Sequence, residues 1–538
     1  MLYLCFISTI ALLSVAFITC YIISTYGFLA TVPGPFWARI TNLPRAAWVK
    51  SGRAHVIHQR LHDVHGPVVR LGPSVVSVSD PDAIPAIYPI REGLPKSDFY
   101  RVQRPYTRND GEVAAIFNTQ DEDLHRRLRK PVAYLYSMTN VVSLEPFVDQ
   151  ALRVLFQQLD RRYATSKGVC DLGNWLQYFA YDVMGTLTFS KRYSFLEEGR
   201  DVNGILMAVE KFMNVSSVMG QVPWLDRLLY KNPVSAFFRH TAGSTILAMV
   251  NQCIKERQER KPTIGDESHK LDMLSHFLHI QATNPDIPPN ASKAWTFANV
   301  KAGSDSTASV MQTMLYQLLT HPDSTTRLLE ELYQTTTEIS NSSDMPLPAW
   351  KHIRNLDYLD ACFMEALRLH PPFCLPLERV VQRGGVTISG HYLPQGTVVG
   401  INPYVSNRNP STFGKDVSEW RPERWIGLGP AQRQKMERSV LSFGSGRRSC
   451  LGKNIAILEA KKTIAALFLR YESKFQLAWS WWKDLVVYSS GKGGVFRLTY
   501  AAFRPTIIDP AENVEEERCK DNIDFPSELR DRVGITVK

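Results

Sequence analysis

The sequence predicts a mostly α-helical protein with a small β region near its N-terminus, preceded by one transmembrane helix. Three observations support this fold class. The first 38 residues carry no charged side chain and are dominated by apolar residues. Two short runs of β-branched residues flank a Gly72-Pro73 turn, which is typical of paired strands. Apolar residues at helical spacing recur along much of the remaining chain, most clearly from Ala291 to Thr320.

The apolar N-terminal run extends from Leu2 to about Leu29, and about 20 apolar residues suffice for a helix to span a bilayer. A cleaved signal peptide is the alternative, but the run lacks a basic start and is long for one. Four basic residues follow it, namely Arg39, Arg45, Lys50 and Arg53. Because positively charged flanks stay on the cytosolic side, we expect an uncleaved anchor with the rest of the chain in the cytosol.

These features divide the chain into four parts. Residues 1–30 are expected to form the anchor, and residues 31–50 a hinge stiffened by Pro33-Gly34-Pro35. Residues 51–508 show no internal repeat and are expected to form one large domain. Residues 509–538 are a charged tail beyond it.

Local patterns predict the elements of the large domain. A short helix over 55–65 ends at Gly66-Pro67, and strands follow at 68–71 and 75–78. The stretch from 97 to 120 is irregular and could form a loop over a pocket. Helical spacing of apolar residues predicts further helices over 121–136, 145–162, 174–190, 291–320, 356–370 and 453–470.

Charge and cysteine content narrow the function classes. The net charge is +10, but no basic tract is interleaved with aromatic residues, so nucleic acid is not an expected partner. A basic excess suits an anionic membrane surface or an acidic protein partner. The cluster of Arg126, Arg127, Arg129 and Lys130 is either such a docking site or a solvated helix face. The eight cysteines are scattered without a C-x-x-C pair, which indicates a reducing compartment.

One cysteine lies in a patterned loop. Residues 443–452 fit F-x-x-G-x-R-x-C-x-G at all five fixed positions, which are Phe443, Gly446, Arg448, Cys450 and Gly452. A metal-binding cysteine is a thiolate, and a helix N-terminus with nearby cations lowers its pKa. The glycines suit sharp turns or close approach to a flat group, and the arginine can bind a carboxylate in bidentate fashion. A buried apolar cysteine in a glycine-rich turn is the alternative.

This loop resembles the haem-ligand loop of the cytochromes P-450. The resemblance implies haem b with Cys450 as the thiolate ligand of the iron, a ligand that favours cleavage of the O–O bond of dioxygen. It implies that Phe443, Gly446, Arg448 and Gly452 contribute to cofactor binding. It covers roughly residues 33–505 and implies the cytochrome P-450 fold, with 51–508 as the catalytic domain. The stretch from Pro33 to Pro73 is similar to fungal microsomal members related to pisatin demethylase.

A second motif lies in the middle of the 291–320 helix, where residues 302–307 read A-G-S-D-S-T. A glycine, an acid and hydroxyls in mid-helix are poor choices for stability, so they form either a local groove or a solvent-facing turn. The segment resembles the oxygen-binding helix of the family, which implies that Asp305 and the following alcohol deliver protons during oxygen activation. That alcohol is Ser306, where the family usually has threonine. Because Thr307 follows, either hydroxyl is a candidate, and the charge of Lys301 just before the motif is unexplained.

A third motif pairs Glu365 with Arg368, which share a helix face at i and i+3. On its own this is an ordinary surface pair. The resemblance implies instead a buried structural triad, completed by Arg424 from the downstream P-E-R-W segment.

The resemblance also assigns two more arginines to the haem propionates. Arg129 lies four residues after His125, which occupies the position of a tryptophan in the family pattern. Arg379 follows Pro371-Pro372 and looks like the family's strand arginine. For each, a surface arginine is the alternative.

The expected function is that of a haem-thiolate monooxygenase in fungal secondary metabolism, inserting one oxygen atom from dioxygen into a lipophilic small molecule. The family implies NADPH electrons through NADPH–cytochrome P-450 reductase, with cytochrome b5 as a second donor. It also implies a single-pass protein of the endoplasmic reticulum membrane. The candidate pocket residues, which are apolar, are Phe117, Phe297, Ala298, Phe373, Leu375 and the turn at 493–496.

Two other function classes remain open. One is a haem-thiolate isomerase, dehydratase or peroxygenase that needs no reductase, although such relatives often lack the acid–alcohol pair seen at Asp305 and Ser306. The other is a membrane-anchored haem-binding or haem-sensing protein without turnover. The sequence does not define the substrate.

Overall fold

The structure is a computed structural model that describes residues 27–107, 111–164, 170–232, 242–259, 272–336 and 347–471, with isolated positions 16, 19, 20, 24, 234, 506 and 507. Within these ranges, no helix combines the length and apolar character needed to cross a bilayer. The predicted anchor lies largely outside the described residues, and the charged tail and the turn at 493–496 lie wholly outside them.

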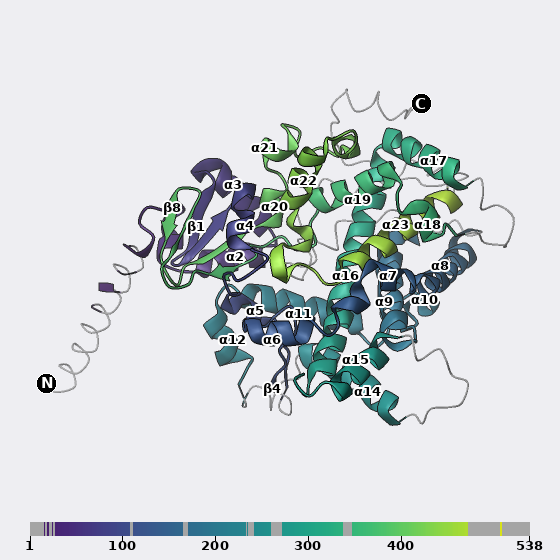
Figure 1. Cartoon of the computed structure of the whole chain (residues 1–538), viewed down its shortest axis with the longest axis horizontal. Helices are drawn as coiled ribbons and strands as arrows, with labels where there is room; N and C mark the ends of the chain where they lie inside the picture. Colours follow the sequence, from purple (N-terminus) through teal and green to yellow (C-terminus); the bar gives the residue numbers. More distant parts are fainter. Residues whose placement is uncertain are drawn as a thin grey trace, which may run out of the picture.

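The described part is mostly helical, with a small β region at one end (Figure 1). Its main sheet has the strand order β1-β2-β9-β6. These strands are β1 (Val68–Gly72), β2 (Val75–Val78), β9 (Val398–Ile401) and β6 (Arg379–Val380). β2 pairs antiparallel with β1 and parallel with β9, so this sheet joins segments that are far apart in the sequence.

The segment predicted as a hinge is packed against this sheet. It contains the 3-10 helix η1 (Phe36–Arg39) and the helix α2 (Leu43–Lys50). A Cβ atom on Gly34 would lie 2.4 Å from the Arg70 carbonyl oxygen, so only glycine fits there. The backbone N–H of Arg70 donates to the Pro33 carbonyl at 2.7 Å. Leu29 and Val32, which precede this contact, are also buried in the core beside the sheet, so the chain is packed into the folded body from Leu29 onward.

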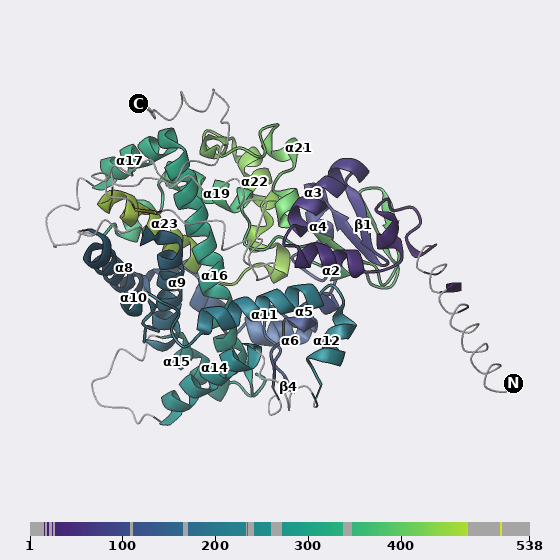
Figure 2. The same ribbon diagram turned by 180° about the vertical axis from the view of Figure 1, so that it is seen from behind.

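The helical body is arranged around α16 (Ala291–Thr320), which Figures 1 and 2 show from opposite sides. α16 contacts helices from both halves of the chain, namely α9 (Leu172–Phe189), α14 (Ala242–Glu259), α15 (Met273–Thr283), α19 (Asp357–Leu369) and α23 (Lys453–Arg470). A Cβ atom on Gly303 would lie 2.8 Å from the Met184 side chain, so this glycine lets α16 approach α9 closely.

The remaining larger elements complete the body. In chain order they are α3 (Ala54–His65), α4 (Ile84–Ile87), α5 (Asp98–Val102), β3 (Tyr106–Thr107), β4 (Gly111–Glu112), α6 (Glu122–Arg129), η3 (Ala133–Tyr136), α7 (Met138–Val142), α8 (Glu145–Leu159), α10 (Phe195–Glu198), α11 (Ile205–Met219), α12 (Pro223–Leu229), α17 (Pro322–Thr336), α18 (Trp350–Ile353), β7 (Val386–Ile388), β8 (His391–Leu393), α20 (Pro403–Ser406), α21 (Pro410–Phe413) and α22 (Pro430–Ser439).

Two predicted segments differ from the structure. The single helix expected over 121–136 is wrong, because α6 ends at Arg129 and a separate 3-10 turn, η3, follows. Pro131 explains the break, since proline lacks the N–H that would continue the helical ladder. The irregular stretch from 97 to 120 contains α5, whose N-terminus is capped by the Ser97 hydroxyl accepting from the Phe99 N–H at 3.2 Å.

Candidate functional site

The cysteine loop is built from two 3-10 turns, η7 (Leu441–Phe443) and η8 (Gly446–Arg448), that lead into α23. The Cys450 N–H donates to the Phe443 carbonyl at 2.8 Å and closes the loop. Gly446 has φ +63° and a Cβ there would lie 2.2 Å from the Tyr88 carbonyl oxygen, so no other residue fits. In contrast, a Cβ on Gly452 would meet nothing within 4 Å, and the Cys450 side chain is exposed. Cys450 is therefore an accessible residue of the loop, and Gly452 has room beside it.

The pKa of Cys450 differs in direction from our expectation. Although the side chain is accessible, protein surrounds the sulfur on most sides, and this burial raises the pKa of the thiol. The backbone amides of Gly452 and Lys453 and the Arg129 guanidinium act in the opposite direction and do not outweigh burial. A raised pKa does not prevent Cys450 from acting as a metal ligand, because a metal ion deprotonates the thiol that coordinates it.

Phe443 lies on the protein side of the loop. Its ring stacks on Phe363 of α19 with centroids 6.5 Å apart, and the Lys453 ammonium lies 5.7 Å from its centroid. Phe443 is half-buried and packs against the largest apolar core. It thus joins the cysteine loop to the helical body.

A cluster of cations lies beside the loop. It comprises Arg129 of α6, Arg379 of β6, Arg448 of the loop itself, and Lys96, whose backbone bridges Arg379 at the sheet edge. Arg448 donates to the Glu122 carboxylate at 2.7 Å, and Arg129 donates to the Ser449 carbonyl at 2.9 Å. Among the described residues, Arg448 is the one member of this cluster that forms an ion pair, with Glu122, so positive charge is in excess.

Electrostatic effects within the cluster follow from this excess. Burial, together with repulsion from Arg379 and Arg448, holds the pKa of Lys96 well below its usual range. Burial and the charges of Arg448 and Arg129 lower the pKa of His125 to about 3. The buried Nε2 of His125 has no hydrogen-bond partner. Such a group of buried donors is unfavourable unless anions neutralise it, and two carboxylates would do so.

This donor set fits haem, whose two propionates would be held by the cation cluster while Cys450 ligates the iron. Lys96 is a member that sequence reasoning missed. It follows Leu94-Pro95 in an irregular stretch and carries no motif. Only its pairing with Arg379, distant in the sequence, brings it to the site.

The acid–alcohol motif lies on two different faces of α16. The Ser306 hydroxyl donates to the Ala302 carbonyl at 2.7 Å, and Ala302 is exposed while Ser306 is half-buried. The Thr307 hydroxyl donates to the Gly303 carbonyl at 2.8 Å and is buried on the face that packs against α9. Asp305 is buried and accepts a hydrogen bond from Gln177 of α9 at 3.1 Å.

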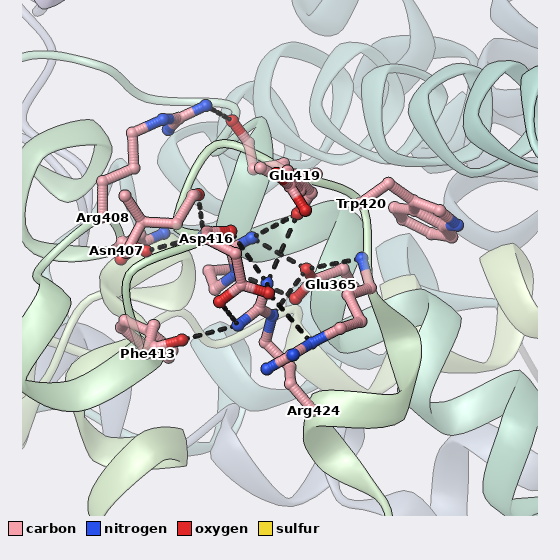
Figure 3. Close-up of polar contacts among 12 residues, drawn as sticks. Glu365, Asn407, Arg408, Phe413, Asp416, Glu419, Trp420 and Arg424 are labelled. Carbon is pink, nitrogen blue, oxygen red and sulfur yellow. Dashed lines mark hydrogen bonds and ion pairs between the residues drawn. The ribbon is translucent and has the colours of Figure 1, made fainter.

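Figure 3 shows the carboxylate of Glu365 at the centre of a buried polar cluster. Arg368 donates to both of its oxygens, at 2.8 and 2.7 Å, and Arg424 donates to Oε1 at 2.8 Å. The Trp425 indole N–H donates to Oε2 at 2.9 Å. Glu365 and Arg368 are fully buried. The structure therefore brings the three residues of the expected triad together, with Arg424 also paired to Asp416 at 3.1 Å.

The cluster is continuous with the cysteine loop through Asn407. Arg368 donates to the Asn407 carbonyl at 3.2 Å. The Asn407 side chain accepts from the Leu441 N–H at 3.1 Å and donates to the Ser442 hydroxyl at 3.2 Å. Glu365 thus supports the start of the loop that carries Cys450.

The apolar residues expected around a substrate lie on α16 and on the loops near it. Phe297 is buried and meets Phe212 of α11 edge to face at 6.5 Å, whereas Ala298 is half-buried. Phe373 contacts Phe99 of α5 at 6.1 Å, and Leu375 packs in the same small core. Phe117 is 42% exposed.

The thiol loop, the cation cluster and the buried triad together define the haem-thiolate class of protein. The chain matches the family model described as cytochrome P450 over residues 32–478, and it belongs to that family. Family membership implies haem b held by a cysteine thiolate.

Relatives at high identity carry matching names. The chain is 57% identical over 473 residues to cytochrome P450 monooxygenase mpaDE of Penicillium roqueforti, covering 87% of this chain and 55% of that protein. It is 49% identical over 461 residues to pkfB of Emericella nidulans and 48% identical over 457 residues to asR2 of Sarocladium schorii, both named cytochrome P450 monooxygenases. These alignments cover 86% and 84% of this chain and 89% and 88% of the relatives. The chain thus spans about half the length of mpaDE and most of the other two.

Proposed function

We propose that this chain is a haem-thiolate monooxygenase that inserts one oxygen atom from dioxygen into a lipophilic small molecule, in fungal secondary metabolism. The observation that carries the proposal is an accessible thiol, Cys450, in a loop bordered by an excess of buried cations. Relatives from fungi that are named monooxygenases support it. Electrons would come from NADPH through a cytochrome P450 reductase, with cytochrome b5 as a second donor.

The chain's residues take distinct roles in this proposal. Cys450 ligates the iron, and Gly446 and Gly452 shape the loop around it. Arg129, Arg379 and Arg448 hold the propionates, with Lys96 and His125 beside them. When bound, haem supplies the oxygen-activating chemistry.

Proton delivery is assigned to α16. Ser306 shares a face with the exposed Ala302, whereas Thr307 is buried against α9, so the geometry supports Ser306 as the acting alcohol. The Asp305 carboxylate, oriented by Gln177, is the acid that exchanges protons with it. This pair also supports a monooxygenase over an isomerase, dehydratase or peroxygenase.

The test is reconstitution of the haem-loaded protein with a reductase. We expect NADPH and dioxygen to be consumed together in the presence of substrate. Turnover with hydrogen peroxide alone, or without any oxidant, would point to the reductase-independent class, and haem binding without any turnover would point to a sensor.

Substitutions at the acid–alcohol pair should alter the fraction of consumed NADPH that leads to product. Ser306→Ala is expected to raise hydrogen peroxide release relative to product with haem content unchanged, because a proton donor is lost. Ser306→Thr should be tolerated, since the hydroxyl is retained. Asp305→Asn should slow turnover more strongly. NADPH consumed, peroxide released and product formed are measured side by side, with Thr307→Ala as the matched control. Uncoupling by Thr307→Ala but not Ser306→Ala would move the role to Thr307.

We also propose a membrane location. Phe36, Trp37 and Leu43 are 60%, 64% and 65% exposed in η1 and α2, and Trp224 and Leu228 of α12 are 66% and 64% exposed. α2 and α12 both pack against α11, so the helices that carry most of these side chains have a common neighbour. With the apolar run at 1–30, they support a single-pass protein of the endoplasmic reticulum whose catalytic domain, within 51–508, faces the cytosol.

Removal of residues 1–30 is expected to release only part of the protein from membranes, because the exposed apolar side chains of α2 and α12 would retain some of it. Centrifugation of cell extracts, with and without high salt, measures the fraction released. Glycosylation of full-length protein at Asn214 or Asn290 would show that the domain faces the lumen, contrary to the proposal.

A further inference from the structure

Lys301 of α16 is a half-buried residue whose ammonium is desolvated by the surrounding protein, and the family roles above do not use it. Its ammonium donates to the Gln103 side-chain oxygen at 3.0 Å and lies 4.5 Å from the centroid of the Phe212 ring. Within the described part of the chain it forms no ion pair with a carboxylate. Burial, with the charge of Lys231 adding to it and that of Asp305 opposing it, lowers the pKa of Lys301 to about 7.

Other buried lysines of this protein have acidic partners. Lys231 pairs with Asp226 at 3.0 Å, Lys462 pairs with Asp149 at 2.9 Å, and Lys461 pairs with Asp360 at 3.4 Å. Lys96, which lacks one, belongs to the cation cluster. An ammonium carries three donors, and one amide oxygen and one aromatic face do not replace the carboxylate that the other lysines have. Lys301 thus has no direct carboxylate partner among the described residues, because the nearest acid whose charge acts on it, Asp305 one turn further along α16, accepts a hydrogen bond from Gln177.

Lys301 lies next to residues of α16 that the proposed function places near the substrate. Ala302, the next residue, is exposed, and Lys301 itself keeps partial exposure. Phe297, one turn earlier, packs against the same Phe212 ring that Lys301 contacts. Ser306 lies five residues further along α16, or about 7.5 Å along the helix axis. A molecule bound near Ser306 with its apolar part against these rings would place a polar end within reach of Lys301.

We propose that Lys301 binds a carboxylate of the substrate, so that the substrate class is lipophilic carboxylic acids. This inference rests on the proposed monooxygenase function. The carboxylate supplies the direct ion pair that Lys301 does not form with Asp305, and Gln103 orients the ammonium toward it. Since the Gln103 oxygen also accepts from the Ser216 hydroxyl of α11 at 3.2 Å, the lysine is held between α5, α11 and α16.

The experiment compares acids with their methyl esters on the haem-loaded protein. Binding of 4-hexylbenzoate, decanoate and their two methyl esters is measured from the shift of the haem absorption on titration. For the wild type we expect each acid to bind at least about tenfold more tightly than its ester, as a charge-assisted hydrogen bond supplies. Lys301→Gln and Lys301→Met should lose this preference, whereas Lys211→Met should retain it, because Lys211 is an exposed residue of α11.

Each outcome either supports or overturns the assignment of Lys301 as a carboxylate-binding residue. Acids that fail to bind, or that bind no better than their esters, overturn the inference, as does a preference that survives in both Lys301 variants. If neither variant loads haem, Lys301 is a structural residue and the inference is also overturned. The thiolate spectrum of the reduced carbon monoxide complex is recorded for every sample. Its absence from the wild type would defeat the proposed function, whereas lost acid preference with an intact spectrum defeats only this inference.

Discussion

Cys450→Ala is expected to abolish the red-shifted absorption of the reduced carbon monoxide complex, and with it all monooxygenase activity. The substitution removes the sulfur while leaving the loop hydrogen bond from the residue 450 N–H to Phe443 in place, because that bond uses only the backbone. The cation cluster is also unchanged, so some haem could still bind without the thiolate. The absorption spectrum of the purified, reduced protein under carbon monoxide is the measurement.

The matched control is Cys253→Ala. This cysteine is half-buried on α14, so its loss tests the effect of removing any thiol. The control should keep the thiolate spectrum in full. If the Cys450→Ala protein also kept the thiolate spectrum, the assignment of Cys450 as the haem ligand would be wrong, and with it the roles given to the cation cluster.

Glu365→Ala should give misfolded, haem-free protein. It leaves Arg368 and Arg424 buried beside a missing carboxylate and also removes the acceptor of the Trp425 indole N–H. Breaking a buried ion pair from one side costs about 3–5 kcal/mol, a large part of the roughly 5–15 kcal/mol by which folded domains are stable. Soluble yield, thermal unfolding and the ratio of haem to protein absorbance measure the effect.

Glu437→Ala provides the comparison. Glu437 pairs with Arg433 at 2.8 Å on α22, but both side chains are well exposed, so its loss should cost less than about 1 kcal/mol. Normal haem loading is expected there. If Glu365→Ala were equally soluble and haem-loaded, the cluster in Figure 3 would contribute little to the fold.

Much of the fold could be predicted from the sequence, because the long helices have regularly spaced apolar residues and clear terminating residues. The helix predicted over 291–320 coincides with α16, which His321-Pro322 terminates, and the helix over 453–470 coincides with α23. Pro131 is a helix breaker that the sequence also shows. The apolar spacing on both sides of it nevertheless led to the wrong prediction of one continuous helix over 121–136. Apolar spacing therefore predicts helix ends best in segments that contain no proline.

The site was only partly readable. Motif spacing pointed to Cys450 and to the pair of Glu365 and Arg368, since each lies in a local pattern, whereas Arg424 was assigned through the family resemblance. Lys96 and the surroundings of Lys301 could not be predicted, because they depend on strand pairing and helix packing between distant segments. The direction of the Cys450 pKa was missed for a related reason, as burial of the sulfur is a property of the whole fold.

The Asn407 bridge has a consequence for the order of assembly. The backbone at the start of the cysteine loop is held by Asn407, and the Cys450 N–H by the Phe443 carbonyl, so protein groups hold the backbone that carries the sulfur. A polypeptide that forms these contacts before it meets its cofactor already has the loop backbone in place. Cofactor capture can then be a late, nearly rigid docking step, and the folding of the chain around Glu365 determines how many molecules become competent to receive it.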